Sequence, residues 1–423
     1  MLNASGAAGG NVSSEPNGPH RDNPALRAPL VGRRVVDLTR VLAGPWCTMT
    51  LADLGADVIK IEHPRGGDDT RHWGPPYVAG ESAYFLCANR NKRSVAVDLA
   101  NPAGQRIVRE LARHADILVE NYKLDGLTKF QLDYATIAEM NPKIIYCSIS
   151  GYGRNSPIAE RPGYDYVIQA EGGLMAVTGE VEGEPMKAGV AVADLFTGMA
   201  ATQAILSALI ACERDGIGQH IDMALFDCQL AMMANVGSSF LATGQEPRRY
   251  GNGHPTVVPY QVFDSSDGKV VIAIGNDRQF ASFCNSLLGL PDLAFDDRFS
   301  TNSARVAHRE ELLATLRPLI RAKPTGFWLE KMRSIGIPGG QVRSVGDALR
   351  SPEAAGRNMV SDIPHPTAGR VSLVASPLKL TRTPVIEPVA PPLLGEHTES
   401  VLRQVLNYDE ATILSLRRDH VIV

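Results

Sequence analysis

The sequence predicts an α/β fold with a large Rossmann-like domain on a parallel sheet and a smaller α+β domain. Short apolar runs alternate with amphipathic segments through the first half, which is typical of strands joined by right-handed helical crossovers. The composition changes near Gly244, and a strong hairpin signal, Ser-Ser-Asp-Gly between 260–264 and 269–274, follows. A length of 423 residues also favours two domains over one.

The expected elements begin with a βαβ unit. Strands at 35–38 and 58–61 flank a helix at 43–54. Pockets in such sheets lie beyond the carboxyl ends of the strands, which carry TRVLAGP, EHPRGG, DLANPAG and ENYKLDG here. The other expected strands are 94–99, 116–119, 143–149 and 219–223, and the other expected helices are 103–115, 133–140, 195–211, 225–241, 279–288, 304–322 and 327–335.

Composition divides the chain into four segments. Residues 1–30 are rich in Gly, Ala, Ser, Asn and Pro, so we expect a disordered leader. This leader has no hydrophobic core of a secretory signal, and its acidic residues argue against a transit peptide, which favours a cytoplasmic location. Residues 31–225 are the expected first part of the large domain. A linker helix and the small domain follow at 226–345, and a return linker with the C-terminal part of the large domain at 346–423.

The overall composition is that of a soluble globular protein, with 44% hydrophobic and 21% charged residues. A net charge of −4 without a basic stripe argues against a nucleic-acid partner. No apolar run reaches membrane-spanning length, because Thr202, Gln203 and Ser207 interrupt the most apolar helix. The six cysteines lack paired or metal-like spacing, so we expect reduced, buried thiols and no metal.

Glu62 stands at the end of the second expected strand, where a dinucleotide-binding domain places the acid that binds ribose. The glycine fingerprint of such domains is missing, since TRVLAGPWC offers one glycine where three are required. Glu62 is therefore interpreted as a solvated strand end, and an NAD-dependent oxidoreductase is not favoured.

Asp194 follows the small, apolar run Ala-Gly-Val-Ala-Val-Ala and precedes a long apolar helix. An acid at this point has two possible roles. It can be an N-cap that accepts hydrogen bonds from the first helical turn. It can also be a carboxylate in a dry pocket that is available for covalent chemistry. The local pattern favours the cap, and the two roles are compatible.

The order of segments resembles the class III CoA-transferases, which include formyl-CoA transferase and the carnitine CoA-transferases. The likeness runs through DLTRVLAGPWCTMTLADLGADVIKIEHPRGGDDTR, NRNKRSVAVDL, ADILVENY, GVAVADLFTGM and PPLLGEHTESVL, and covers about 31–419. RRYGNGHPTVVPYQVFDSSDG is similar to the succinate–hydroxymethylglutarate CoA-transferase group in particular.

The resemblance implies a CoA-transferase that moves CoA from an acyl-CoA donor to a carboxylic acid. The expected donor is succinyl-CoA, and the expected acceptor is a dicarboxylic acid. Asp194 matches the family's nucleophile, which forms aspartyl anhydride and aspartyl-CoA thioester intermediates. CoA thioesters are then substrates, and no cofactor is bound permanently. The resemblance also implies an interlocked, ring-like homodimer, with neither nucleic acid nor membrane as a partner.

The family's CoA-binding positions carry over onto thirteen residues, of which His63 and Lys129 replace arginines of formyl-CoA transferase. Because a neutral His pairs poorly with phosphate, the nearby Arg90, Lys92 and Arg93 are possible replacements. The thirteen are Leu42, Ala43, His63, Val97, Asp98, Leu99, Ala100, Asn121, Tyr122, Lys123, Lys129, Arg161 and Tyr164.

Two further groups concern the acid substrate. Gly251, Gly253 and His254 match the family's mobile glycine loop over the nucleophile, with a plain interdomain turn as the alternative. Arg40 follows the first strand and can clamp a second carboxylate through paired hydrogen bonds. Arg71, Arg248 and Arg249 are rivals for that role, each also readable as a surface arginine.

Two rival functions share the fold or the ligand. A 2-methylacyl-CoA racemase needs a proton donor and acceptor on both faces of the α-carbon. Similar racemases carry Gly-His-Asp where this chain has Gly163-Tyr164-Asp165, so the His base is missing. A non-catalytic acyl-CoA-binding protein is the second rival, and it would not need Asp194.

Overall fold

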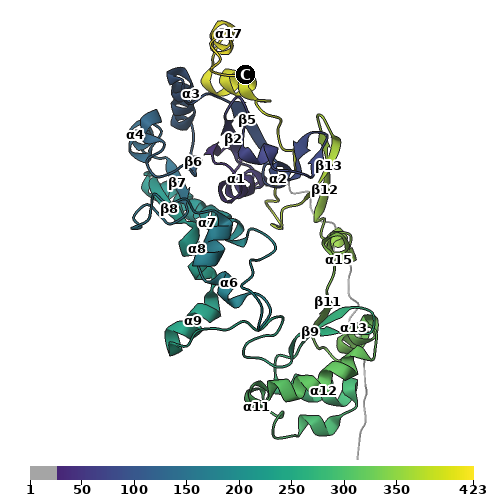
Figure 1. The fold of residues 1–423 in the computed structure, drawn as a ribbon. Helices are drawn as coiled ribbons and strands as arrows, with labels where there is room; N and C mark the ends of the chain where they lie inside the picture. Colours follow the sequence, from purple (N-terminus) through teal and green to yellow (C-terminus); the bar gives the residue numbers. More distant parts are fainter. Residues whose placement is uncertain (1–25) are drawn as a thin grey trace, which may run out of the picture.

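The computed structural model describes residues 26–423, and its large sheet has six parallel strands in the order β5-β2-β1-β6-β7-β8 (Figure 1). This is the strand order of Rossmann domains, in which the chain winds outwards from its first strand in both directions. The predicted parallel sheet is therefore confirmed. The strands are β1 (Arg34–Leu38), β2 (Asp57–Glu62), β5 (Lys92–Ala96), β6 (Ile117–Glu120), β7 (Ile145–Ser150) and β8 (Gln219–Ala224).

Helices cover both faces of this sheet. Val36 and Leu38 of β1 belong to the core on one face, and Val35 belongs to the core on the other. Since alternate residues of a strand point to opposite faces, burial on both sides requires continuous apolar strands. The first face packs against α3 (Pro102–Arg113), α4 (Tyr134–Met140), α16 (Thr398–Leu406) and α17 (Glu410–Arg418), and the second against α1 (Ala43–Asp53) and α7 (Val192–Asp215).

A second core lies in the lower part of Figure 1, around a three-stranded antiparallel sheet in the order β11-β10-β9. The expected hairpin is present, with Asp264 paired to Lys269 across the turn. The domain boundaries after residues 225 and 345 stay predictions. The elements are β9 (Tyr260–Asp264), β10 (Lys269–Ala273), β11 (Gly339–Gln341), α10 (Asp277–Ser282), α11 (Asn302–Ala307), α12 (Arg309–Arg321) and α13 (Thr325–Ser334).

Two expected helices are interrupted. The helix at 225–241 divides into α8 (Leu225–Met232) and α9 (Ala234–Thr243), because Ala234 has a φ of +43° and cannot continue a right-handed helix. The helix at 304–322 divides at His308, which ends α11 and precedes α12. Apolar periodicity runs across both interruptions, so it gave no sign of either.

The helix α7 corrects the expectation that no apolar segment reaches membrane-spanning length. It has 24 residues, and by length and composition alone it could cross a bilayer; it is the one such helix in residues 26–423. The core helix of a soluble protein passes the same test, and α7 packs along α1 through buried residues such as Ala201 and Ile205. Its other side carries the exposed Phe196, Met199 and Ile210.

Most of the expected leader, residues 1–25, lies outside the described residues. Its last residue, Leu30, is buried, and its N–H donates to the carbonyl of Leu54 at 2.8 Å. The packed part of the chain therefore begins before residue 31.

Candidate active site

The cavity that contains Asp194 lies where the winding of the sheet reverses, between β1 and β6. Neighbouring loops diverge at such a point and leave a crevice beyond the carboxyl ends of the strands. The loops after β1, β6 and β7, the segment before α5 (Asp165–Glu171), and the start of α7 supply the walls. The residues that line this cavity include Arg40, Val41, Leu42, Ala43, Asn121, Tyr122, Lys123, Arg161, Tyr164 and Asp194.

A second cavity adjoins the first. Arg40, Asp69 and Tyr122 line both of them, so these residues form the divide between the two. The second cavity extends over the end of β2 and the segment after β5. An elongated ligand can therefore run from the ends of β2 and β5 to Asp194.

Asp194 occupies the first turn of α7, as the third residue of the helix. Its predicted role as N-cap is wrong, because Ala191 takes the cap position. Gly198, one turn further on, allows α7 to approach α1: a Cβ at this position would lie 2.7 Å from the carbonyl oxygen of Ala43. The spacing of Asp194 and Gly198 thus places the carboxylate beside the first turn of α1.

Asp165, the first residue of α5, caps α7 in place of Asp194. Its Oδ1 accepts the N–H groups of Ala193 at 2.8 Å and Asp194 at 3.3 Å. Its Oδ2 accepts the side-chain N–H of the buried Gln169 at 2.7 Å. Local sequence did not reveal this residue, because it lies 29 positions from Asp194 in the chain.

Burial raises the pKa of Asp194 to about 7, and the neighbouring negative charge of Asp165 adds to the rise. Removal from water penalises the ionised form, and a nearby like charge does the same. The pKa of Asp194 therefore lies near neutral pH, so both its protonated and its ionised form are accessible there.

Tyr84 is a site neighbour that sequence reasoning missed. It belongs to the short helix α2 (Ala83–Cys87) and packs edge-on against Trp73 with ring centroids 5.2 Å apart. Burial raises the pKa of Tyr84 to about 12, and the charge of Asp194 is the second cause, which puts the phenol near the carboxylate. No sequence motif marks Tyr84, since only the tertiary fold brings α2 to the start of α7.

The structure gathers twelve of the thirteen predicted CoA-binding residues around the two cavities. Lys129 lines neither cavity; it is exposed, with its ammonium 4.7 Å from the ring centroid of Phe130, which does line the second. Leu42, Ala43, Asn121, Tyr122, Lys123, Arg161 and Tyr164 line the Asp194 cavity, and His63, Val97, Asp98, Leu99 and Ala100 line the adjoining one. Their roles stay predictions.

Two of these residues already have strong partners. Arg161 forms an ion pair with Glu171 at 2.5 Å. Asn121 exchanges two hydrogen bonds with the backbone of Arg40. The exposed Arg40 side chain makes only a long contact of 3.4 Å with Asp69 and lies over the Tyr122 ring, so it is available to a ligand.

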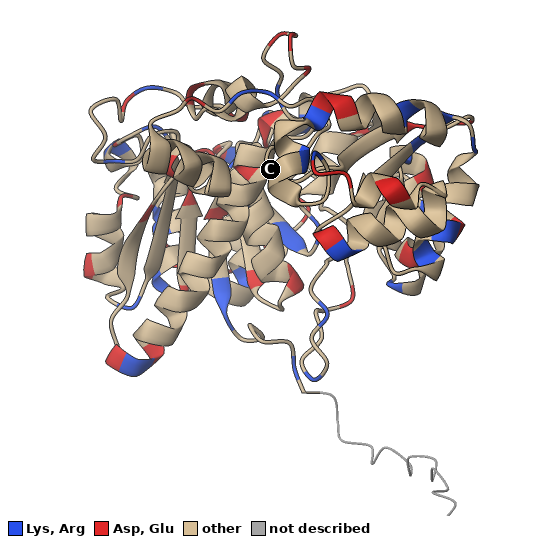
Figure 2. Cartoon of the chain, turned by 90° about the horizontal axis from the view of Figure 1, so that it is seen from below, with Lys and Arg blue, Asp and Glu red and all other residues tan. Residues whose placement is uncertain are grey.

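Unlike Arg40, several other charged residues considered for ligand binding are held in ion pairs within the protein. Glu62 is buried rather than solvated and pairs with Arg71 at 2.7 Å, so neither is a free surface group. Figure 2 shows Lys and Arg interspersed with Asp and Glu along the chain. The possible replacements for phosphate contacts are also engaged: Arg90 with Asp53, Lys92 with Asp37 and Arg93 with Asp57.

The predicted lid residues lie elsewhere in the chain's own fold. Gly251 and Gly253 line a separate cavity with Arg248, and Asp194 is not part of it. His254 stacks near Tyr260, with ring centroids 5.2 Å apart. Within this single chain the loop does not cover Asp194, and its role as a lid stays a prediction.

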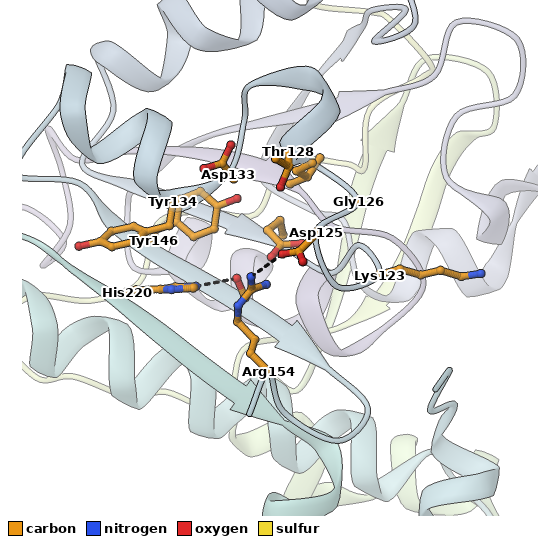
Figure 3. A pocket seen from close by; sticks show the side chains of 12 residues that line it. Lys123, Asp125, Gly126, Thr128, Asp133, Tyr134, Tyr146, Arg154 and His220 are labelled. Carbon is orange, nitrogen blue, oxygen red and sulfur yellow. Dashed lines mark hydrogen bonds and ion pairs between the residues drawn. The ribbon is translucent and has the colours of Figure 1, made fainter. Parts of the chain in front are cut away.

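A further, small polar cavity is lined by the loop that follows β6 (Figure 3). Arg154 pairs with Asp125 at 3.1 Å, and Ser148 is 2.9 Å from the ring of His220. Lys123 points away from this cluster in Figure 3. The Arg154–Asp125 ion pair ties the loop after β6 to the segment after β7. No group of three His, Cys, Asp or Glu side chains in residues 26–423 has a metal-binding arrangement.

The fold and the cavity define a doubly wound α/β protein with a partly buried carboxylate in a cavity at the carboxyl ends of its strands. The chain belongs to CoA-transferase family III, whose match covers residues 30–398. It is therefore an enzyme that transfers CoA, and CoA thioesters are its substrates.

Individual relatives agree with this assignment. A succinate–glutarate CoA-transferase of Agrobacterium fabrum is 45% identical over 91% of this chain and 97% of its own length. The mouse succinyl-CoA:glutarate CoA-transferase is 44% identical over 93% of this chain and 90% of its own length. A CAIB/BAIF family protein of Brucella suis has a similar crystal structure, with a TM-score of 0.81, 45% identity, and coverage of 90% of this chain and 100% of that one.

Proposed function

We propose that this enzyme moves CoA from succinyl-CoA to a dicarboxylic acid, with glutarate as the first acceptor to test. The observation that carries the proposal is Asp194, a partly buried carboxylate with a pKa of about 7 in a cavity that adjoins a second cavity. Relatives named for succinate or succinyl-CoA and glutarate are 42–45% identical over most of the chain, which supports these two substrates.

The proposed chemistry uses Asp194 as a covalent relay. Its carboxylate attacks the thioester carbonyl of succinyl-CoA, which gives a succinyl–aspartyl anhydride and the CoA thiolate. The thiolate attacks the aspartyl carbonyl, so succinate leaves and an aspartyl-CoA thioester remains. The acceptor carboxylate attacks this thioester, which forms a second anhydride and releases the thiolate again. Attack of the thiolate on the acceptor's acyl carbon yields the new acyl-CoA and restores Asp194.

Water must be kept from these intermediates, because anhydrides hydrolyse readily. The burial that raises the pKa of Asp194 supports such exclusion. The dipole of α7 can stabilise negative charge that develops beside Asp194, while the N–H groups of Ala193 and Asp194 themselves bond to Asp165. Arg40 is the proposed clamp for the second carboxylate of the acid, because its guanidinium is exposed at the divide between the cavities.

We also propose a homodimer with the lid supplied by the assembly. The exposed apolar side chains of α7, α8 and α9 support an interface there, because monomers rarely expose large apolar patches. The glycine loop at Gly251 and Gly253 lines a cavity apart from Asp194 in its own chain. A partner subunit can bring the loop to a second copy of Asp194. The exposed apolar side chains of the proposed interface are Phe196, Met199, Ile210, Leu230, Phe240 and Leu241.

The experiment is a substrate panel. Purified protein is incubated with succinyl-CoA and glutarate, hydroxymethylglutarate, malate, oxalate or a monocarboxylic acid of matched length. Mass spectrometry detects the new acyl-CoA, and we expect dicarboxylic acceptors to react with higher kcat/KM than the monocarboxylic control. An enzyme that accepts only monocarboxylic acids, or that uses no succinyl-CoA, would contradict the proposal.

A further inference from the structure

The turn that follows β1 is held almost entirely by side chains from other elements. Five successive backbone polar groups of the turn at 39–41 each bond to a side chain, and four distinct residues supply the partners. The Thr39 N–H donates to Asp37 at 2.9 Å, and the Thr39 carbonyl accepts from Lys60 at 2.8 Å. The Arg40 N–H donates to the Asn121 side chain at 2.9 Å, and the Arg40 carbonyl accepts from the same side chain at 2.7 Å. The Val41 N–H donates to Asp68 at 3.2 Å.

The turn needs this support because Val41 has a φ of +71°. A β-branched residue rarely occupies the left-handed region, where its side chain crowds its own backbone. Leu42 follows directly as the N-cap of α1 and has no side-chain cap bond. The direction in which α1 starts, and the backbone from which the Arg40 side chain extends, therefore depend on a strained residue.

The partners of the turn are themselves rigid. Lys60 and Asp68 are completely buried and form an ion pair at 2.9 Å. Asp68 Oδ1 also accepts the N–H and hydroxyl of Thr70, so its position is fixed from several sides. A buried charge pair of this kind stabilises little by itself but strongly disfavours rearrangement that would separate the charges.

Asn121 has a different position, because it reaches across the crevice from the end of β6 to the end of β1. Both polar atoms of its amide are used by Arg40, the oxygen as acceptor and the nitrogen as donor. The side chain is half-buried and is one of the residues that line the Asp194 cavity. This arrangement is that of a strut between two loops at the point where the winding of the sheet reverses.

We propose that Asn121 is a positioning residue which, together with Asp68, holds the strained Arg40–Val41 turn and so presents Arg40 and the start of α1 to the Asp194 cavity. This replaces a direct contact of the Asn121 side chain with CoA. The inference rests on the proposed function insofar as Arg40 binds the acceptor acid. Without the strut, Val41 relaxes to a negative φ and the Arg40 backbone moves.

The test compares Asn121→Ala, Val41→Gly and the double variant. Glycine adopts a φ of +71° without steric cost. We expect Asn121→Ala to lose about 10- to 100-fold in kcat/KM for the acceptor acid, the usual effect of a small misplacement. Hydrogen exchange of the Arg40 and Val41 amides should also become faster. Val41→Gly in the same chain should recover most of the lost activity, by comparison with Val41→Gly alone.

Asn141→Ala is the matched control. Asn141 is also half-buried, and both polar atoms of its amide also bond to the backbone: the nitrogen donates to the carbonyls of Ala112 and Ala115, and the oxygen accepts the Lys143 N–H. Asn141 does not line the Asp194 cavity or the cavity that adjoins it. It should lower thermal stability without changing exchange at 40–41 or kcat/KM. If Asn121→Ala leaves the Arg40 and Val41 amides protected, or if glycine at 41 rescues nothing, Asn121 does not hold the turn and the proposal is wrong. The exchange measurement needs no turnover, so a wild type that fails to transfer CoA would refute only the proposed function.

Discussion

Asp194 differs from the buried carboxylate of Asp68 in what surrounds it. Burial opposes ionisation of Asp68 too, but the charge of Lys60 and the N–H of Thr70 outweigh it and lower the pKa of Asp68 to about 2. Asp194 has no cation in that position, and its nearest charged neighbour is Asp165, so its pKa rises instead. One carboxylate is locked in a structural pair, and the other is left able to react.

Replacement of Asp194 tests the covalent role. Asp194→Asn keeps the shape of the side chain and removes the nucleophile, so CoA transfer should fall by several orders of magnitude while CoA still binds. Hydroxylamine added during turnover of the wild type should label the peptide that contains Asp194 as a hydroxamate, read by mass spectrometry. Near-normal transfer by the Asn variant, with deamidation excluded, would overturn the mechanism.

The same substitution has a pH-dependent effect on stability. The pKa of about 7 in the folded protein lies above the ordinary value of 3.8 for an aspartate, so between these pH values the folded protein holds a proton that the unfolded chain releases. Stability of the wild type is therefore lost as pH rises through this window. Asp194→Asn removes the group, and its thermal midpoint relative to the wild type should increase from pH 4 to pH 7.

At the level of elements, the start of α7 depends on a cap from α5. Asp165 bonds two N–H groups of the first turn and also repels the Asp194 carboxylate, so one residue sets both the helix start and the reactivity beside it. Two substitutions of Asp165 distinguish the effect of the cap from the effect of the charge. An asparagine at 165 keeps an acceptor for the N–H groups but carries no charge, whereas an alanine removes both.

Asp165→Asn and Asp165→Ala should both move the acid limb of the kcat/KM–pH profile, expected near pH 7 in the wild type, to lower pH. Asp165→Ala should also destabilise the fold by about 1–2 kcal/mol through loss of the cap. The control is Asp133→Ala, which removes the N-cap of α4, where Asp133 accepts the Thr136 N–H at 3.2 Å. It should lose stability with the acid limb unmoved, and an unmoved limb in both Asp165 variants would contradict this account.

At the scale of the whole molecule, the two cores are joined by α8, α9 and the return path through the hairpin of β12 (Val360–His365) and β13 (Gly369–Val374) (Figure 1). The connecting helices expose apolar side chains that a folded monomer would leave in water. Leu241 of α9 is 84% exposed, and Ile210 of α7, which packs against α8, is 69% exposed. In the proposed dimer, a second copy of the chain covers these exposed side chains.

Light scattering at low concentration should therefore find a dimer. Leu241→Asp places a charge in the proposed interface and should yield monomer or aggregate with loss of transfer. Val345→Asp is the matched control, since Val345 is 78% exposed but lies on α14 (Val345–Leu349), away from α7–α9. A wild-type monomer that is stable and active, or a Leu241→Asp variant that remains an active dimer, would count against this interface.

The sequence by itself determined the alternating elements, the parallel sheet, the hairpin at 264–269 and the family, because apolar periodicity and long motifs are local properties of the chain. It also singled out Asp194 and twelve residues that the fold gathers around two adjoining cavities. Only the tertiary structure decided that Asp165 rather than Asp194 caps α7, that Tyr84 lies near Asp194, and that Glu62, Arg71, Arg90, Lys92 and Arg93 are bound in ion pairs. The physical reason is that a charge or a hydrogen bond is satisfied by whatever lies nearest in space, and these partners come from elements far apart in the chain.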